Sequence, residues 1–224
     1  MENEVILPPL YQQVEYIEST GTQWIDSGVM SSNDDWKFIL QFQRTTNTRG
    51  VFLFGNTNGF NASLDNNYVY RATGQAITGI TASNTSFDEV VVESLTTTNV
   101  VKISVNGTLT TGSYSNWNYN NELGVIGGGG YYQIGKYKSL SIYKNNILVR
   151  NFIPCYRKTD NEIGLYDLVN GVFYTNQGTG TFIKGPSIPL EPKTMKLNGK
   201  ILGKINNRNI AHINHISVMS GVDN

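Results

Sequence analysis

Aromatic residues that stand beside asparagine or aspartate are the side chains in this sequence best suited to chemistry. One group lies in an asparagine-rich stretch, a second follows four consecutive glycines, and a third is an Asp-Asp-Trp run. A ring can pack against the apolar face of a sugar while amides and carboxylates hydrogen-bond its hydroxyls. The predicted carbohydrate-binding residues are Asp34, Asp35, Trp36, Trp117, Tyr119, Asn121, Tyr131 and Tyr132. The alternative is that these rings cover a sheet end or pack at a subunit contact, because aromatic residues mostly serve packing.

The acidic residues do not predict catalysis. Glycosidases place two carboxyl groups on either side of the scissile bond, and acids two residues apart on a strand share one face. The sequence has no Glu-x-Asp followed closely by another acid. Its nearest cluster, Asp88-Glu89 with Glu93, lacks the middle acid. Exposed acids are the norm in proteins, so we expect no catalytic residue and no enzyme activity.

Nucleotide binding is not expected either. Residues 130–136 nearly spell a phosphate-binding loop, but Tyr137 stands where that motif needs Ser or Thr. The motif also requires a following helix, whose N-terminus supplies amide donors. Here residues 139–143 alternate like a strand.

Metal ligands are sparse. His212 and His215 are the only histidines, and Cys155 is the only cysteine, predicted to be a buried small hydrophobe. We therefore expect no cofactor and no metal site built on histidine or cysteine. Asp65, beside two asparagines, could hold calcium through oxygen ligands.

Strand patterns recur along residues 1–186. Phe38, Leu40 and Phe42 alternate with polar residues, as expected for a half-buried strand. Asn106-Gly107 and Asn170-Gly171 each separate two apolar runs, a pattern typical of hairpin turns with positive φ. Charged residues are only 15% of the 224, and no window shows a sustained helical period. The sequence predicts an all-β sandwich or jelly roll.

The last residues form a predicted arm with its own character. Prolines 186, 189 and 192 mark a linker, so we place a sandwich domain at residues 1–186 and an arm at 187–224. Residues 196–219 contain a weak eight-residue repeat, which predicts short turn-linked strands with one apolar stripe. From residue 191 on, five cations face two acids, a charge of +3 that leaves −3 on the first 190 residues. The predicted assembly residues are Lys196, Leu197, Lys200, Ile201, Lys204, Ile205, Arg208 and Ile210. A frayed tail is the alternative.

Two segments carry a resemblance to a known family. Residues 14–28 (VEYIESTGTQWIDSG) resemble the opening strands of concanavalin A-like (laminin-G-like) domains in phage and prophage structural proteins. Residues 139–185, with LVRNFIPCYRK, GLYD and NGVFY, resemble their closing part. The resemblance implies a two-sheet jelly-roll sandwich, and it does not extend to the arm. It leaves function open, because this fold serves lectins, glycosidases and structural modules.

These observations together predict a structural protein of a bacteriophage particle, either a tail receptor-binding module or a head decoration or fibre protein. Its sandwich would display a binding surface for cell-surface or mucus glycans, and its arm would bind other virion proteins and further copies of the chain. The acidic N-terminus precedes no signal-peptide core, so we expect synthesis in the host cytoplasm and a place in the virion. A net charge of zero gives no argument for nucleic-acid binding, and no apolar run is long enough to insert in a membrane. The alternatives are a free or cell-surface bacterial lectin or adhesin, and a degraded glycoside hydrolase.

Overall fold

The chain forms two compact units in the computed structural model, residues 1–188 and 189–224, which we call the body and the arm. The structure describes residues 7–46, 51–55, 60–64, 67–72, 75–114, 122–127, 132–189, 193–197 and 200–205. These described residues are strands, turns and loops without helix. They accordingly contain no helix able to span a bilayer. The predicted all-β class is confirmed.

Eleven strands of the body form one antiparallel sheet in the described part of the chain. Its main path runs β11 (Thr108–Ser113), β10 (Val100–Val105), β9 (Asp88–Leu95), β4 (Trp36–Arg44), β13 (Ile134–Lys144), β14 (Ile147–Arg157), β15 (Ile163–Asp167) and β16 (Val172–Thr175). Three shorter strands join beside this path, β1 (Tyr11–Gln13) on β14, β2 (Ile17–Thr20) on β13, and β17 (Ile183–Lys184) on β2.

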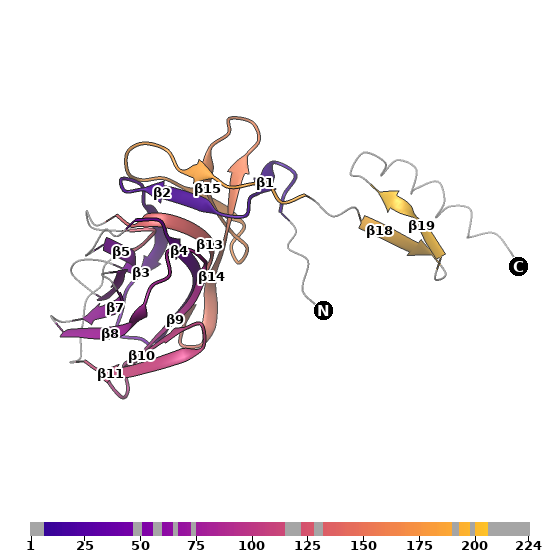
Figure 1. The fold of residues 1–224 in the computed structure, drawn as a ribbon. Helices are drawn as coiled ribbons and strands as arrows, with labels where there is room; N and C mark the ends of the chain where they lie inside the picture. The colour runs from indigo at the N-terminus through magenta and orange to yellow at the C-terminus, as the bar shows by residue number, and fades with distance from the viewer. Residues whose placement is uncertain are drawn as a thin grey trace, which may run out of the picture. The chain divides into compact units, whose positions relative to one another are not determined.

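Six strands form the second sheet of the body, again within the described residues. Its order is β3 (Ile25–Met30), β12 (Glu122–Val125), β5 (Val51–Gly55), β6 (Phe60–Leu64), β7 (Asn67–Ala72) and β8 (Gln75–Thr81). Figure 1 shows the two layers, with β3, β5, β7 and β8 in one and β4, β9, β13 and β14 in the other. The predicted two-sheet sandwich is confirmed.

Alternation along each strand sends one set of side chains into the core. Every second residue of β4 is buried, and Phe38, Leu40 and Phe42 are among them, as predicted. The Phe38 ring stacks on the Phe54 ring of β5, with centroids 3.9 Å apart and planes at 13°. This pair joins the two sheets through direct aromatic contact within the main core.

The two Asn-Gly turns differ in form. Asn106 and Gly107, at φ 50° and 82°, form a two-residue loop between the paired Val105 and Thr108, as predicted. The loop at Asn170-Gly171 has four residues, because Asp167 pairs with Val172. Only its glycine has positive φ, so this second turn is not the two-residue Asn-Gly hairpin that the sequence pattern predicted. The cause is the Asp167 carboxylate, which accepts hydrogen bonds from the amide N–H of Val169 and the side chain of Asn170.

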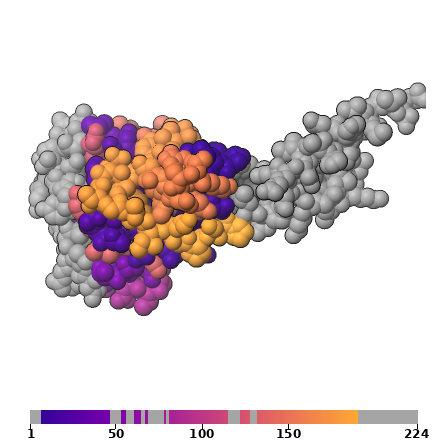
Figure 2. Space-filling view, turned by 90° about the horizontal axis from the view of Figure 1, so that it is seen from above, coloured from indigo at the N-terminus to yellow at the C-terminus, as the bar shows by residue number. Residues whose placement is uncertain are grey.

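A seam of backbone contacts joins residues 13–15 to residues 186–188. The amide of Glu15 donates to the carbonyl of Pro186, Val14 bridges Ser187, and the amide of Ile188 donates to the carbonyl of Gln13. In Figure 2 the indigo N-terminal segment and the orange end of the body accordingly lie together on one surface. These bonds tie Ser187 and Ile188 to the body, so the structure divides the chain two residues beyond the predicted boundary.

The described part of the arm is an antiparallel hairpin of β18 (Lys193–Leu197) and β19 (Lys200–Ile205). Two short paired strands are therefore present, while most of the predicted repeat at residues 196–219 lies outside the described residues. Lys196 pairs with Ile201 and Leu197 pairs with Lys200. Lys204 and Ile205 pair with Thr194 and Lys193, whereas the predicted arm residues Arg208 and Ile210 lie outside the described residues.

Candidate functional site

Half of the predicted aromatic site lies outside the described residues, namely Trp117, Tyr119, Asn121 and Tyr131. Tyr132 is described and half-buried just before β13. The predicted calcium-binding Asp65 is also outside the described residues. No group of three His, Cys, Asp or Glu side chains suited to a metal occurs among the described residues.

Trp36 cannot serve as an exposed sugar platform, and its predicted role is wrong. Its side chain is only 1% exposed, and its ring stacks on Phe38 in the main core. The indole N–H donates a hydrogen bond of 2.9 Å to the carbonyl of Ser32. Trp36 is the first residue of β4, and its side chain points inward with every second residue of that strand. Both faces of its ring are therefore buried.

Asp34 holds the turn between β13 and β14. Its carboxylate forms an ion pair of 2.9 Å with the Lys144 ammonium and accepts hydrogen bonds from Asn145 and Ser32. These hydrogen bonds, led by that of Ser32, lower the pKa of Asp34 from 3.8 to about 2. The carboxylate therefore anchors a turn before any ligand arrives.

Asp35 caps a neighbouring turn. Its Oδ1 accepts hydrogen bonds of 2.8 Å from the amide of Thr96 and 2.9 Å from the hydroxyl of Thr96. Its own amide donates to the side-chain oxygen of Asn145. The Asp34-Asp35-Trp36 run thus contacts the turn after β9 and the turn between β13 and β14, and each of its three side chains already has a partner within the protein.

A shallow pocket, which we call the corner pocket, opens beside this run. Its volume is about 150 Å³. Glu93 stands in its wall between two cations, 3.1 Å from the Lys37 ammonium and 3.8 Å from the Lys102 ammonium. All three side chains are partly exposed, so each retains capacity for a ligand. The lining residues are Asp35, Trp36, Lys37, Glu93, Leu95, Lys102 and Asn146.

The corner pocket lies at one end of an outer face, defined as the outward side chains of β4, β9, β10 and β13. The strand register aligns these side chains in rows across the sheet. One row contains Tyr143, Lys37, Glu93 and Lys102. The next contains Ser141, Ile39, Val91 and Ser104, and a third contains Ser139, Gln41 and Glu89. The surface thus offers hydroxyl, amide and ammonium groups around a small apolar centre.

The acids of β9 divide between the two faces of the sheet. Glu89 and Glu93 share the outer face, as predicted. Asp88 is buried, and its carboxylate accepts hydrogen bonds from the Tyr68 hydroxyl, the Ser83 amide and the Asn106 side chain. Burial and the Asp88 carboxylate raise the pKa of Tyr68 well above its usual value, so the phenol stays a hydrogen-bond donor. Asp88 therefore joins strands and loops at one end of the core.

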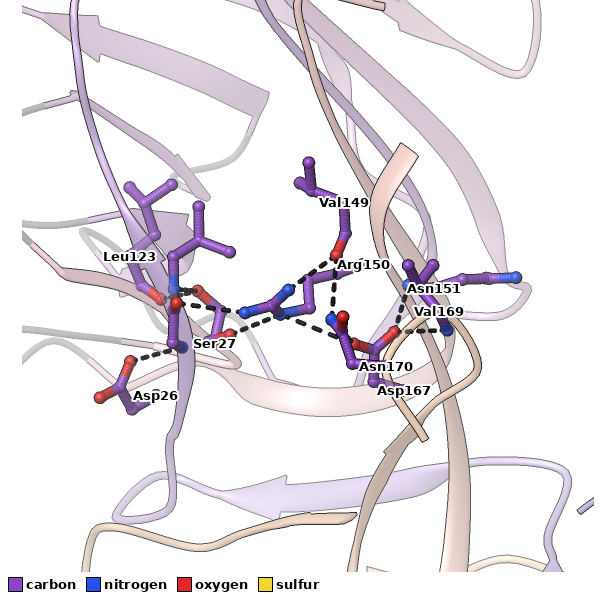
Figure 3. Close-up of polar contacts among 11 residues, drawn as sticks. Asp26, Ser27, Leu123, Val149, Arg150, Asn151, Asp167, Val169 and Asn170 are labelled. Atoms are coloured by element: carbon purple, nitrogen blue, oxygen red, sulfur yellow. Dashed lines mark hydrogen bonds and ion pairs between the residues drawn. The ribbon is translucent and has the colours of Figure 1, made fainter. Parts of the chain in front are cut away.

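The residues that carry the family resemblance meet in one buried network, shown in Figure 3. The Arg150 guanidinium on β14 donates hydrogen bonds to the carbonyls of Ser27 (2.9 Å) and Gly28 (3.1 Å) on β3. Its third nitrogen donates to the carbonyl of Val149 at 2.7 Å. Asp167, which is completely buried, lies 3.6 Å from the Arg150 Nε.

Asp167 is itself fully engaged. One carboxylate oxygen accepts the amide N–H groups of Asn151 and Val169, and the other accepts the Asn170 side chain at 2.7 Å. Every nitrogen of the Arg150 guanidinium donates a bond to a carbonyl. This network links the two sheets and the β15–β16 turn, and it brings together the two segments that carry the resemblance.

A second surface was not found from the sequence. Tyr16 precedes β2 and Phe87 precedes β9, yet their ring centroids lie 6.2 Å apart. The Lys136 ammonium lies 4.7 Å from the Tyr16 ring, and the Lys138 ammonium lies 5.7 Å from the Phe87 ring. The four side chains, which we call the lysine–aromatic patch, come from three separate segments, so no local motif predicts them.

Comparison with known proteins finds similarity in structure alone. No family model matches this chain. No curated protein matches its sequence. A candidate carbohydrate-binding protein of Bacteroides ovatus matches with a TM-score of 0.55 and 11% identity, over 81% of this chain and 62% of that protein. This chain therefore spans less than two thirds of that protein.

Two further structures match less closely. The CBM40 of the Ruminococcus gnavus IT-sialidase has a TM-score of 0.48 and 13% identity, over 61% of this chain and 92% of that one. The extracellular region of zebrafish Gpr126/Adgrg6 has a TM-score of 0.48 and 9% identity, over 76% of this chain and 26% of that one. The similarity to the Bacteroides ovatus protein shows a shared β-sandwich fold.

Proposed function

We propose that the body is a carbohydrate-binding module and that the corner pocket holds one sugar unit of a chain lying along the outer face. The observation that carries the proposal is the pocket itself, about 150 Å³ at the end of a polar sheet surface. Sites for drug-sized molecules occupy roughly 300–1,000 Å³, so the corner pocket suits one small ring. The fold shared with a candidate carbohydrate-binding protein supports the same assignment.

The pocket chemistry fits a neutral or charged sugar. The Lys37 and Lys102 ammonium groups donate hydrogen bonds, and Glu93 accepts them from sugar hydroxyls. The Asn146 amide can do both, and Leu95 offers an apolar contact to C–H groups. The ion pairs with Glu93 hold both ammonium groups near the opening before a ligand binds.

Glycan binding can be tested on an array with the complete chain and an Asn146→Gly, Lys102→Met variant. Asn146 has φ 63°, so glycine preserves the turn while removing the amide. We expect affinity to fall about tenfold, or about 1.4 kcal/mol, with the melting temperature unchanged. The matched control is Asn161→Gly, another asparagine at positive φ (60°) on an exposed turn. Unchanged binding by the double variant would contradict the pocket assignment, and an array without any bound glycan would contradict the function.

We propose further that the arm attaches the body to a bacteriophage particle. The separate compactness of the arm, its net positive charge and the family resemblance of the body support this assignment. A chain ending at Ile188 keeps the complete seam, because Ile188 bonds to Gln13. We expect this chain to fold with the melting temperature of the full chain and to be absent from purified particles. Its normal incorporation would refute the anchoring role, and a full chain found only free in the medium would favour a bacterial lectin or adhesin.

A further inference from the structure

The lysine–aromatic patch differs from the corner pocket in its charge balance. In the described part of the chain, neither Lys136 nor Lys138 forms an ion pair. Lys37, Lys102 and Lys144, by contrast, each lie within 4 Å of a carboxylate. The patch therefore presents two ammonium groups that lie over ring faces and have no described carboxylate within 4 Å.

The fold fixes both lysines on the outer face. The pairing of β13 with β4 shifts between Tyr137 and Ser139, so Lys138 is the extra residue of a bulge. Tyr137 and Leu140, on either side of the shift, are both buried. Lys138 and Ser139 consequently both avoid the core, and Lys138 is exposed to solvent.

The Tyr16 ring packs closely against the residue that follows β17. A Cβ on Gly185 would lie 2.8 Å from the Tyr16 ring, so only glycine allows the end of β17 to pack against it. Both Tyr16 and Phe87 are half-buried, which leaves part of each ring accessible. The nearest acid in the strand register is Glu18, directly opposite Lys136, and no ion pair joins the two.

We propose that the lysine–aromatic patch is a second subsite of the same outer face and binds a sugar that carries a carboxylate or sulfate group. The inference rests on the proposed glycan-binding function and adds a ligand class to it. The anionic group would lie between the two ammonium groups, and the C–H face of the ring would contact Tyr16 and Phe87. Ammonium groups without a carboxylate partner favour an acidic sugar over a neutral one.

The position of the patch suits an oligosaccharide that reaches both subsites. Gln43 pairs with Lys136 at the patch, and Lys37 lines the corner pocket, both on the outward face of β4. The six-residue step from Lys37 to Gln43 spans about 20 Å at roughly 3.3 Å per residue. Ser139, Ser141 and Gln41 line the surface between these ends and can hydrogen-bond the sugar hydroxyls of a chain.

The test is calorimetric titration of the complete chain with two linear oligosaccharides of equal length, one of uronic acid units and one of the matching neutral hexose. We expect the acidic chain to bind about tenfold more tightly at about 50 mM salt, and this preference to shrink at about 500 mM salt. A Lys136→Met, Lys138→Met variant should lose the preference yet keep its affinity for the neutral chain. The control is Lys184→Met, because Lys184 also lies over a ring, that of Tyr156, and forms no ion pair among the described residues.

The outcomes separate this inference from the function on which it rests. Equal affinity for both oligosaccharides, unchanged in the double variant, would overturn the subsite while leaving glycan binding intact. Absence of binding to either oligosaccharide and to a glycan array would overturn both. Binding of a polyglutamate peptide as tightly as the uronic acid chain, with the same loss in the double variant, would replace the sugar by an acidic peptide.

Discussion

Replacing Asp167 by asparagine should destabilise the body far more than the same change at an exposed aspartate. The asparagine would keep one oxygen for the amide N–H groups of Asn151 and Val169. Its new NH₂ group would face two donors, the Asn170 side chain and the Arg150 guanidinium. The substitution therefore loses a charge-assisted hydrogen bond and leaves a largely buried cation without its carboxylate.

The expected loss is about 3 kcal/mol of unfolding free energy. Hydrogen bonds to charged groups contribute roughly 1.5–3 kcal/mol, and breaking a buried ion pair costs roughly 3–5 kcal/mol. The lower end of the ion-pair range applies, because three carbonyls still accept hydrogen bonds from Arg150. For a body of this size the melting temperature should fall by about 6–12 °C.

Equilibrium urea unfolding followed by tryptophan fluorescence measures the loss, since Trp36 lies in the core. The control is Asp160→Asn, which removes another aspartate paired with an arginine, Arg157, but at an exposed site. We expect that control to change stability little, because solvent screens exposed ion pairs. A loss below about 0.5 kcal/mol for Asp167→Asn, or an equal loss in both variants, would refute the role given to the buried network.

Three further predictions concern single groups. The Cys155 thiol, whose pKa burial raises to about 12, should resist a thiol reagent at neutral pH and react once urea unfolds the chain. Because the pKa of Asp34 falls from 3.8 to about 2 on folding, its contribution to stability is complete above pH 3.8 and lost as pH drops toward 2. An Asp34→Asn variant should therefore show a flatter stability profile over this interval in acid titrations of the unfolding free energy. Gly164→Ala should lower the melting temperature sharply, because its Cβ would lie 2.1 Å from the carbonyl oxygen of Tyr174.

Each of these has an internal check. Gly107→Ala is the control for Gly164→Ala, since its Cβ would meet nothing within 4 Å and only the positive φ (+82°) would be strained. Rapid labelling of Cys155 in the folded chain would contradict its burial. Parallel acid profiles for Asp34→Asn and the unaltered chain would show that the Lys144 and Ser32 contacts of Asp34 do not persist in solution.

The sandwich could be predicted because its strands bury every second residue, and that alternation is visible in the sequence. The same signal could have prevented the error at Trp36. Trp36 lies an even number of residues from Phe38, Leu40 and Phe42, so it belongs to the same inward-facing set of side chains. The two aspartates before it led to the prediction of an exposed residue. Phase along the strand decides burial here because the sheet packs on one face only.

The candidate sites were harder to predict, because strand pairing builds them from distant segments. Tyr16 and Phe87 are 71 positions apart in sequence, and their contact depends on how β2 and β9 are placed around β13 and β4. The corner pocket likewise joins the start of β4, the end of β9 and the turn before β14. The sequence motifs that contain Arg150 and Asp167 could be recognised. That the two residues meet could not be predicted, because it depends on the register of β14 with β15.

The seam between residues 13–15 and 186–188 has a consequence for protein engineering. Because it places residues 13–15 beside residues 186–188, a host polypeptide could enter and leave the body at neighbouring points. The body is therefore suited to grafting into a surface loop of an unrelated protein, and to circular permutation with a short linker across the seam. In either format the outer face would remain a continuous surface, since none of its four strands contributes to the seam.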